Sequence, residues 1–133
     1  MINNTLFFLL IRFAIAASMF GHGLARMPKL KAFSNWMVMD FEKSIIPKTW
    51  VRLFSYALPF IELSVGVLLF IGLFTQAAAA AGGFITVVFI LGSTLTEKWD
   101  ALPSQLTHTA FFAALLYFIH YNALALDSLI ILP

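Results

Sequence analysis

Four long apolar stretches follow one another along the chain, separated by shorter polar segments. A helix needs about 20 residues to cross the hydrocarbon core of a bilayer, and each stretch comes close to that length. With approximate boundaries, the stretches cover residues 5–24, 53–74, 77–95 and 105–126. The second and third stretches are separated only by residues 75 and 76, which forces them into an antiparallel hairpin. The pattern predicts an all-α fold, an integral membrane antiparallel four-helix bundle.

The connection between the first two apolar stretches has a pattern of its own. Leu30, Phe33, Met37 and Phe41 recur at helical spacing, with polar residues between them. This alternation predicts a short amphipathic helix over about residues 30–43, lying in the membrane interface between the first two transmembrane helices. The alternative is a loop that packs on the bundle and has no functional role.

The composition excludes a water-soluble enzyme. The 133 residues are 62% hydrophobic and only 11% charged, whereas soluble domains carry about twice that charge. No linker or repeat divides the chain, so we expect a single transmembrane domain over residues 1–133. The first stretch lacks a basic leader and is interrupted by Arg12, which favours an uncleaved helix over a signal peptide. The sequence contains no Cys, which excludes disulfides, thiol relays and cysteine-bound iron–sulfur clusters within the chain.

The basic residues are concentrated on one side of the predicted bundle. Six of the eight Lys and Arg residues lie between residues 26 and 52, and Lys98 lies in the other loop on the same side. The positive-inside rule places the long basic loop in the cytoplasm and both termini outside, in what we expect to be a bacterial inner membrane. Trp36, Trp50 and Trp99 lie on this side too, as an aromatic belt would. Clustered charge of this kind indicates membrane orientation and not nucleic-acid binding.

Ionisable residues inside the apolar stretches are candidate functional groups, since a charge near the bilayer centre is costly. Arg12 in the first helix and Glu62 in the second fall at similar predicted depths, so we expect them to form an ion pair. Such a pair is either a structural clamp or part of a charged cavity that binds an acidic or quinoid head group.

Two histidines are predicted to lie at one level on different helices. His22 is flanked by glycines and has Arg26 one turn away on its face, and His108 enters the fourth helix. Two such side chains could ligate a haem or a metal, hydrogen-bond a quinone oxygen, or bond only to nearby groups. Haem ligation is the less favoured of these, because no carboxylate is evident to orient either ring. We expect no metal, and no cofactor motif is present in the sequence. Hydroxyls at Ser93, Thr94 and Thr96 could line a polar pocket below His22 and Glu62, or they could instead bond to the carbonyls of their own helix.

Several short motifs resemble those of the DoxX family of small four-helix membrane proteins. They are Arg12, the run Gly21-His22-Gly23-Leu24-Ala25-Arg26, the run Pro59-Phe60-Ile61-Glu62, and then Gly66, Leu69, Gly72 and Thr75. The family usually has Lys where this chain has Arg26. The resemblance implies a four-helix bundle and an association with membrane redox systems, and it marks Arg12, His22, Arg26 and Glu62 as a presumed polar site.

Our leading hypothesis is a membrane subunit of a redox-associated system, with an intramembrane polar pocket for a quinone or a small anionic ligand. The predicted ligand-binding residues are Arg12, His22, Arg26, Glu62 and His108; the sequence identifies no catalytic residue. A redox partner protein would supply electrons, and membrane lipid surrounds the bundle. The alternatives are a small transporter or channel, which would require a homo-oligomer to build a pathway, and a non-catalytic structural or assembly subunit.

Overall fold

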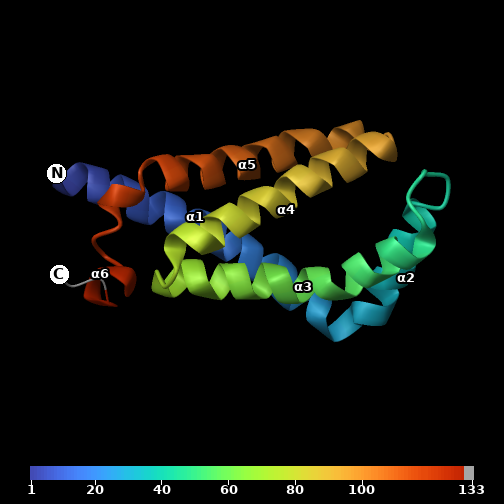
Figure 1. The fold of residues 1–133 in the computed structure, drawn as a ribbon, viewed down its shortest axis with the longest axis horizontal. Coiled ribbons are helices and arrows are strands. Elements are labelled where there is room, and N and C mark those ends of the chain that lie inside the picture. Colours follow the sequence, from blue (N-terminus) through green and yellow to red (C-terminus); the bar gives the residue numbers. More distant parts are fainter. Residues whose placement is uncertain (131–133) are drawn as a thin grey trace.

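The computed structural model describes residues 1–130, and every regular element in that range is helical. In chain order, with η for 3₁₀ turns, the elements are α1 (Ile2–Arg26), η1 (Met27–Lys29), α2 (Leu30–Asp40), α3 (Lys48–Ile71), α4 (Thr75–Leu95), η2 (Trp99–Ala101), α5 (Leu102–Tyr117), η3 (Ile119–Tyr121) and α6 (Asp127–Ile130). The described chain runs back and forth along the long axis, so that its two termini, Met1 and Ile130, lie at one end and α2 lies at the other (Figure 1).

Three stretches of the described chain are long and apolar enough to cross a membrane. They are Ile2–Asp40, which contains α1 and α2, then α3 and α4. The expectation of an all-helical chain with membrane-capable helices is therefore confirmed. The fourth stretch differs from the prediction, because α5 has only 16 residues, fewer than the roughly 20 that a spanning helix needs.

Glycines bring α1 and α3 close together. A Cβ atom at Gly23 would come within 2.6 Å of the Leu63 backbone nitrogen, and one at Gly66 would come within 2.5 Å of the Phe20 nitrogen. Because residue 23 faces residue 63 while residue 20 faces residue 66, the two helices run in opposite directions. Small residues at such positions allow backbones to approach and gain packing contacts that lipid would not supply.

The turn between α3 and α4 lies earlier than predicted. α3 ends at Ile71, and Gly72 adopts the left-handed conformation with φ +68°, which glycine tolerates without a Cβ penalty. α4 then begins at Thr75, within the segment predicted to be the link. The apolar run alone did not reveal this boundary, since Leu73 and Phe74 are as apolar as the helix before them.

The fourth predicted helix, residues 105–126, is wrong at its C-terminal end. α5 stops at Tyr117, and after η3 the chain turns back to cover the α3–α4 turn. There the backbone N–H groups of Leu126 and Asp127 donate to the carbonyls of Ile71 and Gly72 at 3.2 and 2.9 Å. Carbonyls at a helix C-terminus lack partners within their own helix, so this segment satisfies groups that a continued α5 would have left free.

Candidate ligand-binding site

The expected ion pair between Arg12 and Glu62 does not form. Both side chains are only 2% exposed, but each has other partners. The contacts between α1 and α3 place Arg12 beside Gly72, and ten helical residues separate Gly72 from Glu62, a rise of about 15 Å. The prediction was wrong because it estimated depth from loop boundaries, whereas the glycine contacts set the actual register of the two helices.

Glu62 pairs instead with Arg26, the last residue of α1. The Nη1 atom of Arg26 donates to Oε1 of Glu62 at 2.5 Å, and its guanidinium lies 4.7 Å from the centre of the Phe33 ring. The second carboxylate oxygen of Glu62 is buried and has no partner among the described residues. Arg26 is therefore the cation that compensates the buried negative charge of Glu62. This ion pair links the C-terminal end of α1 to α3.

His108 lies beside α1 but is fully engaged in hydrogen bonds. Its Nε2 atom lies 2.6 Å from the Ser18 hydroxyl, and its Nδ1 atom lies 2.7 Å from the carbonyl oxygen of Ser104. The carbonyl only accepts, so Nδ1 carries the proton and Nε2 accepts from Ser18. The His22 ring is exposed, with its centre 6.2 Å from that of His108. Both nitrogens of His108 are therefore hydrogen-bonded within the chain.

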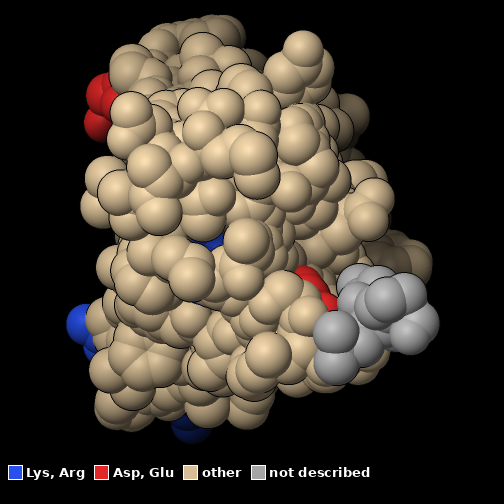
Figure 2. Space-filling model, turned by 90° about the vertical axis from the view of Figure 1, so that its left-hand side faces the viewer, with Lys and Arg blue, Asp and Glu red and all other residues tan. Residues whose placement is uncertain are grey.

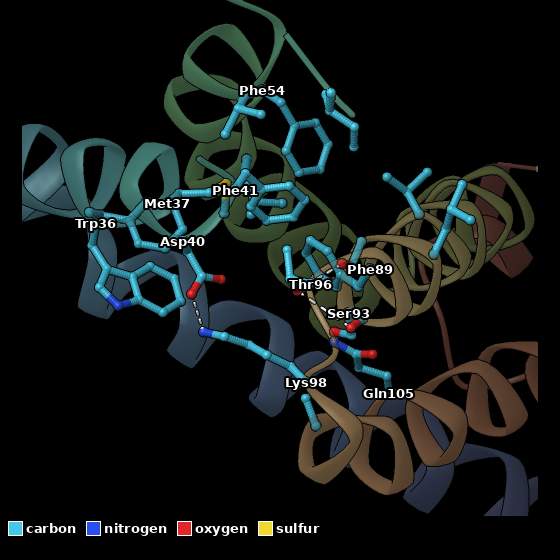
Figure 3. Close-up of a pocket in the computed structure, with 18 of the residues that line it drawn as sticks. Trp36, Met37, Asp40, Phe41, Phe54, Phe89, Ser93, Thr96, Lys98 and Gln105 are labelled. Carbon is cyan, nitrogen blue, oxygen red and sulfur yellow. Dashed lines mark hydrogen bonds and ion pairs between the residues drawn. The ribbon is translucent and has the colours of Figure 1, made fainter. Parts of the chain in front are cut away.

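A cavity of about 430 Å³ lies near this ion pair, at the end of the molecule opposite the termini. We call it the aromatic cavity, and α2, α3, α4 and the start of α5 enclose it. Its ring-bearing lining residues are Phe33, Trp36, Phe41, Trp50, Phe54 and Phe89. Its polar lining residues are Arg26, Asp40, Ser93, Thr96, Lys98 and Gln105. Figure 3 shows Phe41, Phe54 and Phe89 grouped on one side of this space, with Trp36 set apart from them near Lys98.

Two polar contacts join lining residues at the edge of the cavity. Lys98 donates to the Asp40 carboxylate at 2.5 Å and lies 4.7 Å from the centre of the Trp36 ring, so it ties the α4–α5 loop to α2 (Figure 3). Gln105 donates through Nε2 to the Ser93 hydroxyl at 2.7 Å, which ties α5 to α4. The edge of the cavity is therefore built from side chains of α2, α4, α5 and the α4–α5 loop.

Arg12 belongs to a second polar cluster at the end where the termini lie. It donates to Oδ1 of Asn122 at 2.6 Å and to the carbonyl of Leu124 at 2.8 Å. Nδ2 of Asn122 in turn donates to the Thr75 hydroxyl at 3.0 Å and to Asp127 at 3.3 Å. These contacts hold the segment after α5 against the α3–α4 turn, and they place Arg12 at the opposite end of the molecule from the aromatic cavity.

Asp127 caps α4 from outside the helix. Its carboxylate accepts the backbone N–H groups of Phe74 at 2.7 Å and Thr75 at 2.8 Å, groups that have no partner within α4. Burial opposes the charge of Asp127, but these hydrogen bonds and the nearby Arg12 outweigh it and lower the pKa of the carboxyl. Asp127 is therefore ionised in the folded protein at neutral pH.

Comparison with known proteins places this chain in a family. A family model described as DoxX matches residues 7–95. The chain belongs to the DoxX family. The comparisons with curated proteins and with solved structures give no match. Together with its three membrane-capable helices, the family makes this chain an integral membrane protein.

The DoxX match covers α1 to α4 and stops before α5. It therefore includes Arg12, His22, Arg26 and Glu62 and leaves out His108. Of these five predicted site residues, only Arg26 lines the aromatic cavity. Glu62 does not line it but forms the ion pair with Arg26. The structure brings Arg26 and Glu62 together and places His22 beside His108, but Arg12 lies apart.

The sequence interpretation missed most of the cavity wall in this DoxX protein. Phe33 and Met37 on α2 and Phe41 just after it, which predicted an interfacial helix, line the cavity. The α2 helix packs on α3, where the buried hydroxyl of Ser55 donates to that of Ser34 at 2.6 Å. The signal was present in the apolar face of 30–43, but apolarity alone does not distinguish a lipid-facing surface from one that faces a cavity.

No metal site is evident in the structure. Within residues 1–130, no group of three or more His, Cys, Asp or Glu side chains is placed to hold a metal ion. A second hollow of about 490 Å³, which we call the outer groove, lies between α3 and α4 and is lined by residues including Phe60, Val65 and Ala81. None of its lining residues carries a charge, and Ser64 contributes a hydroxyl to it.

Proposed function

We propose that this DoxX protein is a membrane subunit of a redox system whose aromatic cavity binds the ring of a quinone. The observation that carries the proposal is a cavity of about 430 Å³ walled by aromatic side chains and edged by a few polar groups. Ligand pockets are typically about 300–1,000 Å³ and combine such a wall with a small number of orienting polar groups. A flat, mostly apolar ring with oxygen at its edge matches both features, and aromatic side chains favour stacked or edge-on contacts with it.

The charges around the cavity favour a quinone over a small anionic ligand. The two cations in its lining, Arg26 and Lys98, are already paired with Glu62 and Asp40. A free anion would compete with those carboxylates and would lose its hydration in a mainly apolar space. A quinone ring carries no charge and requires only hydrogen bonds at its oxygens.

In this proposal the residues of the predicted polar site take different positions relative to the quinone. Arg26, paired with Glu62, lines the cavity, while His22 on α1 and His108 on α5 lie beside each other outside its lining. The chain has no cysteine, and we propose that electrons reach or leave the quinone through a partner protein. Reduction of a quinone to a quinol takes two electrons from that partner and two protons.

The membrane placement follows the distribution of charge. We propose that α1, α3, α4 and the shorter α5 cross a bacterial inner membrane as an antiparallel four-helix bundle, with α2 at the cytoplasmic interface. The end that carries the termini has a mainly uncharged surface (Figure 2). The basic residues between 26 and 52 lie in and around α2 and the start of α3, at the other end. This asymmetry supports a cytoplasmic α2 and termini outside.

Quenching of tryptophan fluorescence tests the function, because Trp36 and Trp50 line the cavity. Decylubiquinone added to the full chain in mild detergent should quench this fluorescence saturably. Val88 lines the cavity, whereas Val87 is 52% exposed on the outside of α4. Val88→Phe should fill the cavity and weaken binding at least tenfold, and Val87→Phe should leave it unchanged. Linear, non-saturating quenching, or equal behaviour of the two variants, would refute quinone binding in this cavity.

A further inference from the structure

A hydrogen-bonded pair of neutral side chains lies on the edge of the aromatic cavity. Ser93 on α4 is 8% exposed, and its hydroxyl accepts a hydrogen bond from the amide nitrogen of Gln105 on α5 at 2.7 Å. Both residues line the cavity (Figure 3). Unlike Arg26 and Lys98, the other polar groups discussed above, neither is occupied by an ion pair.

Each member of the pair has one unused hydrogen-bonding group. The amide oxygen of Gln105 is buried and accepts no hydrogen bond from the described residues. The Ser93 hydroxyl accepts from Gln105, and none of the hydrogen bonds found within residues 1–130 uses its proton. A hydroxyl can donate and accept at the same time, whereas an amide oxygen only accepts. The edge of the cavity therefore offers one free donor and one free acceptor a few ångströms apart.

A buried polar atom without a partner is costly, and a bound molecule can supply the missing partner. The two oxidation states of a quinone need opposite partners. The carbonyl oxygen of a quinone only accepts a hydrogen bond, while the hydroxyl of a quinol also donates one. A site that had only donors would favour the quinone, and one that had only acceptors would favour the quinol.

We propose that Ser93 and Gln105 form the recognition point for a quinone ring oxygen in both oxidation states. The Ser93 hydroxyl donates to the carbonyl of the quinone, and the amide oxygen of Gln105 accepts from the hydroxyl of the quinol. This inference rests on the proposed quinone-binding function and adds a property to it: the cavity holds substrate and product with similar affinity.

Calorimetric titration of the full chain in mild detergent tests the inference, with decylubiquinone and its chemically reduced form as the two probes. Gln105→Met keeps the length of the side chain and removes the acceptor, so it should weaken quinol binding about tenfold, the equivalent of one hydrogen bond. Quinone binding should change less than threefold, because Ser93 still donates. The double variant Ser93→Ala/Gln105→Met should weaken both forms. Gln76→Met, at an exposed position outside the cavity, is the matched control and should change neither.

The unchanged affinity of Gln105→Met for the quinone also shows that the variant is folded. If this variant cannot be purified, Gln105→Asn, which withdraws the amide by one methylene, should give the same selective loss. Equal weakening of both forms by a folded single variant, or no weakening of either, would overturn the role of the pair while leaving quinone binding intact. Absence of binding to the unmodified protein would instead refute the proposed function, and this inference with it.

Discussion

Replacement of Arg26 with Met leaves the Glu62 carboxylate buried without its cation. Glu62 is 2% exposed, and its only partner in the described structure is Arg26 at 2.5 Å. Removal of one member of a buried ion pair costs about 3–5 kcal/mol, because the remaining charge is uncompensated. The reverse replacement, Glu62→Met, should cost only about 1–2 kcal/mol. The Arg26 side chain is 26% exposed and keeps its contact with Phe33, so it can turn its charge toward water.

The double variant Arg26→Met/Glu62→Met should be close to the unmodified protein in stability. Apolar residues of similar size often replace a buried ion pair at little cost, and we expect the free energy of unfolding to lie within about 1 kcal/mol of the original. The coupling between the two positions would then be several kcal/mol, far above the about 0–1 kcal/mol of an exposed pair. Lys48 and Glu42, which lie 3.5 Å apart and are about two-thirds exposed, form the control pair.

The measurement is reversible unfolding in mixed micelles with increasing dodecyl sulfate, followed by circular dichroism. Four proteins complete each cycle: the unmodified chain, the two single variants and the double variant. Additive effects of Arg26→Met and Glu62→Met, or a larger loss from Glu62→Met than from Arg26→Met, would refute the reasoning. The buried pair would then not be the contact that holds the α2 end of α1 and α3 together.

Three further predictions concern the packing and the far end of the bundle. Asp127→Asn should lower the melting temperature at pH 7, and the difference should shrink as the pH falls below the ordinary aspartate value of about 3.9. Because the folded pKa of Asp127 is lowered, its contribution is complete above that value and is lost as the pH falls through the lowered one. Gly23→Ala should destabilise the protein by about 1–3 kcal/mol, because the new Cβ would lie 2.6 Å from an α3 backbone nitrogen. Gly21→Ala is the control and should leave the stability unchanged, because a Cβ there has nothing within 4 Å. Chemical unfolding of the two variants compares their free energies of unfolding. Arg12→Met should free Asn122 and raise amide hydrogen exchange over residues 118–127, whereas unchanged exchange would show that Arg12 does not hold this segment.

The membrane-capable helices could be predicted because long apolar runs follow directly from the thickness of the bilayer. The relative register of those helices could not be predicted from the sequence. Hydropathy located Arg12 and Glu62 inside helices, but their pairing depends on which residues of α1 and α3 touch. Gly23 and Gly66 decide that through close backbone contacts, and their role is visible only once both helices are placed.

The aromatic cavity was also beyond prediction from the sequence, because its wall combines side chains from separate elements. Phe33 belongs to a segment predicted to lie on the membrane surface. Phe89 belongs to a long apolar run, where nothing in the sequence distinguishes a cavity-lining residue from a lipid-facing one. Ser93 was recognised as a possible lining hydroxyl, but its partner Gln105 lies on another helix. The end of the fourth helix was missed for a similar reason: Asn122 and the chain after it leave the helix to satisfy Arg12 and the α3–α4 turn.

Photolabelling with an azido-substituted quinone tests the central claim, that the aromatic cavity binds a quinone ring, most directly. After illumination of the full chain in lipid vesicles, peptide mapping should place the label within residues 33–41 and 88–96, and excess decylubiquinone should displace it. Label that gathers instead on the outer groove near Phe60 and Ala81, or that excess quinone does not displace, would contradict the account.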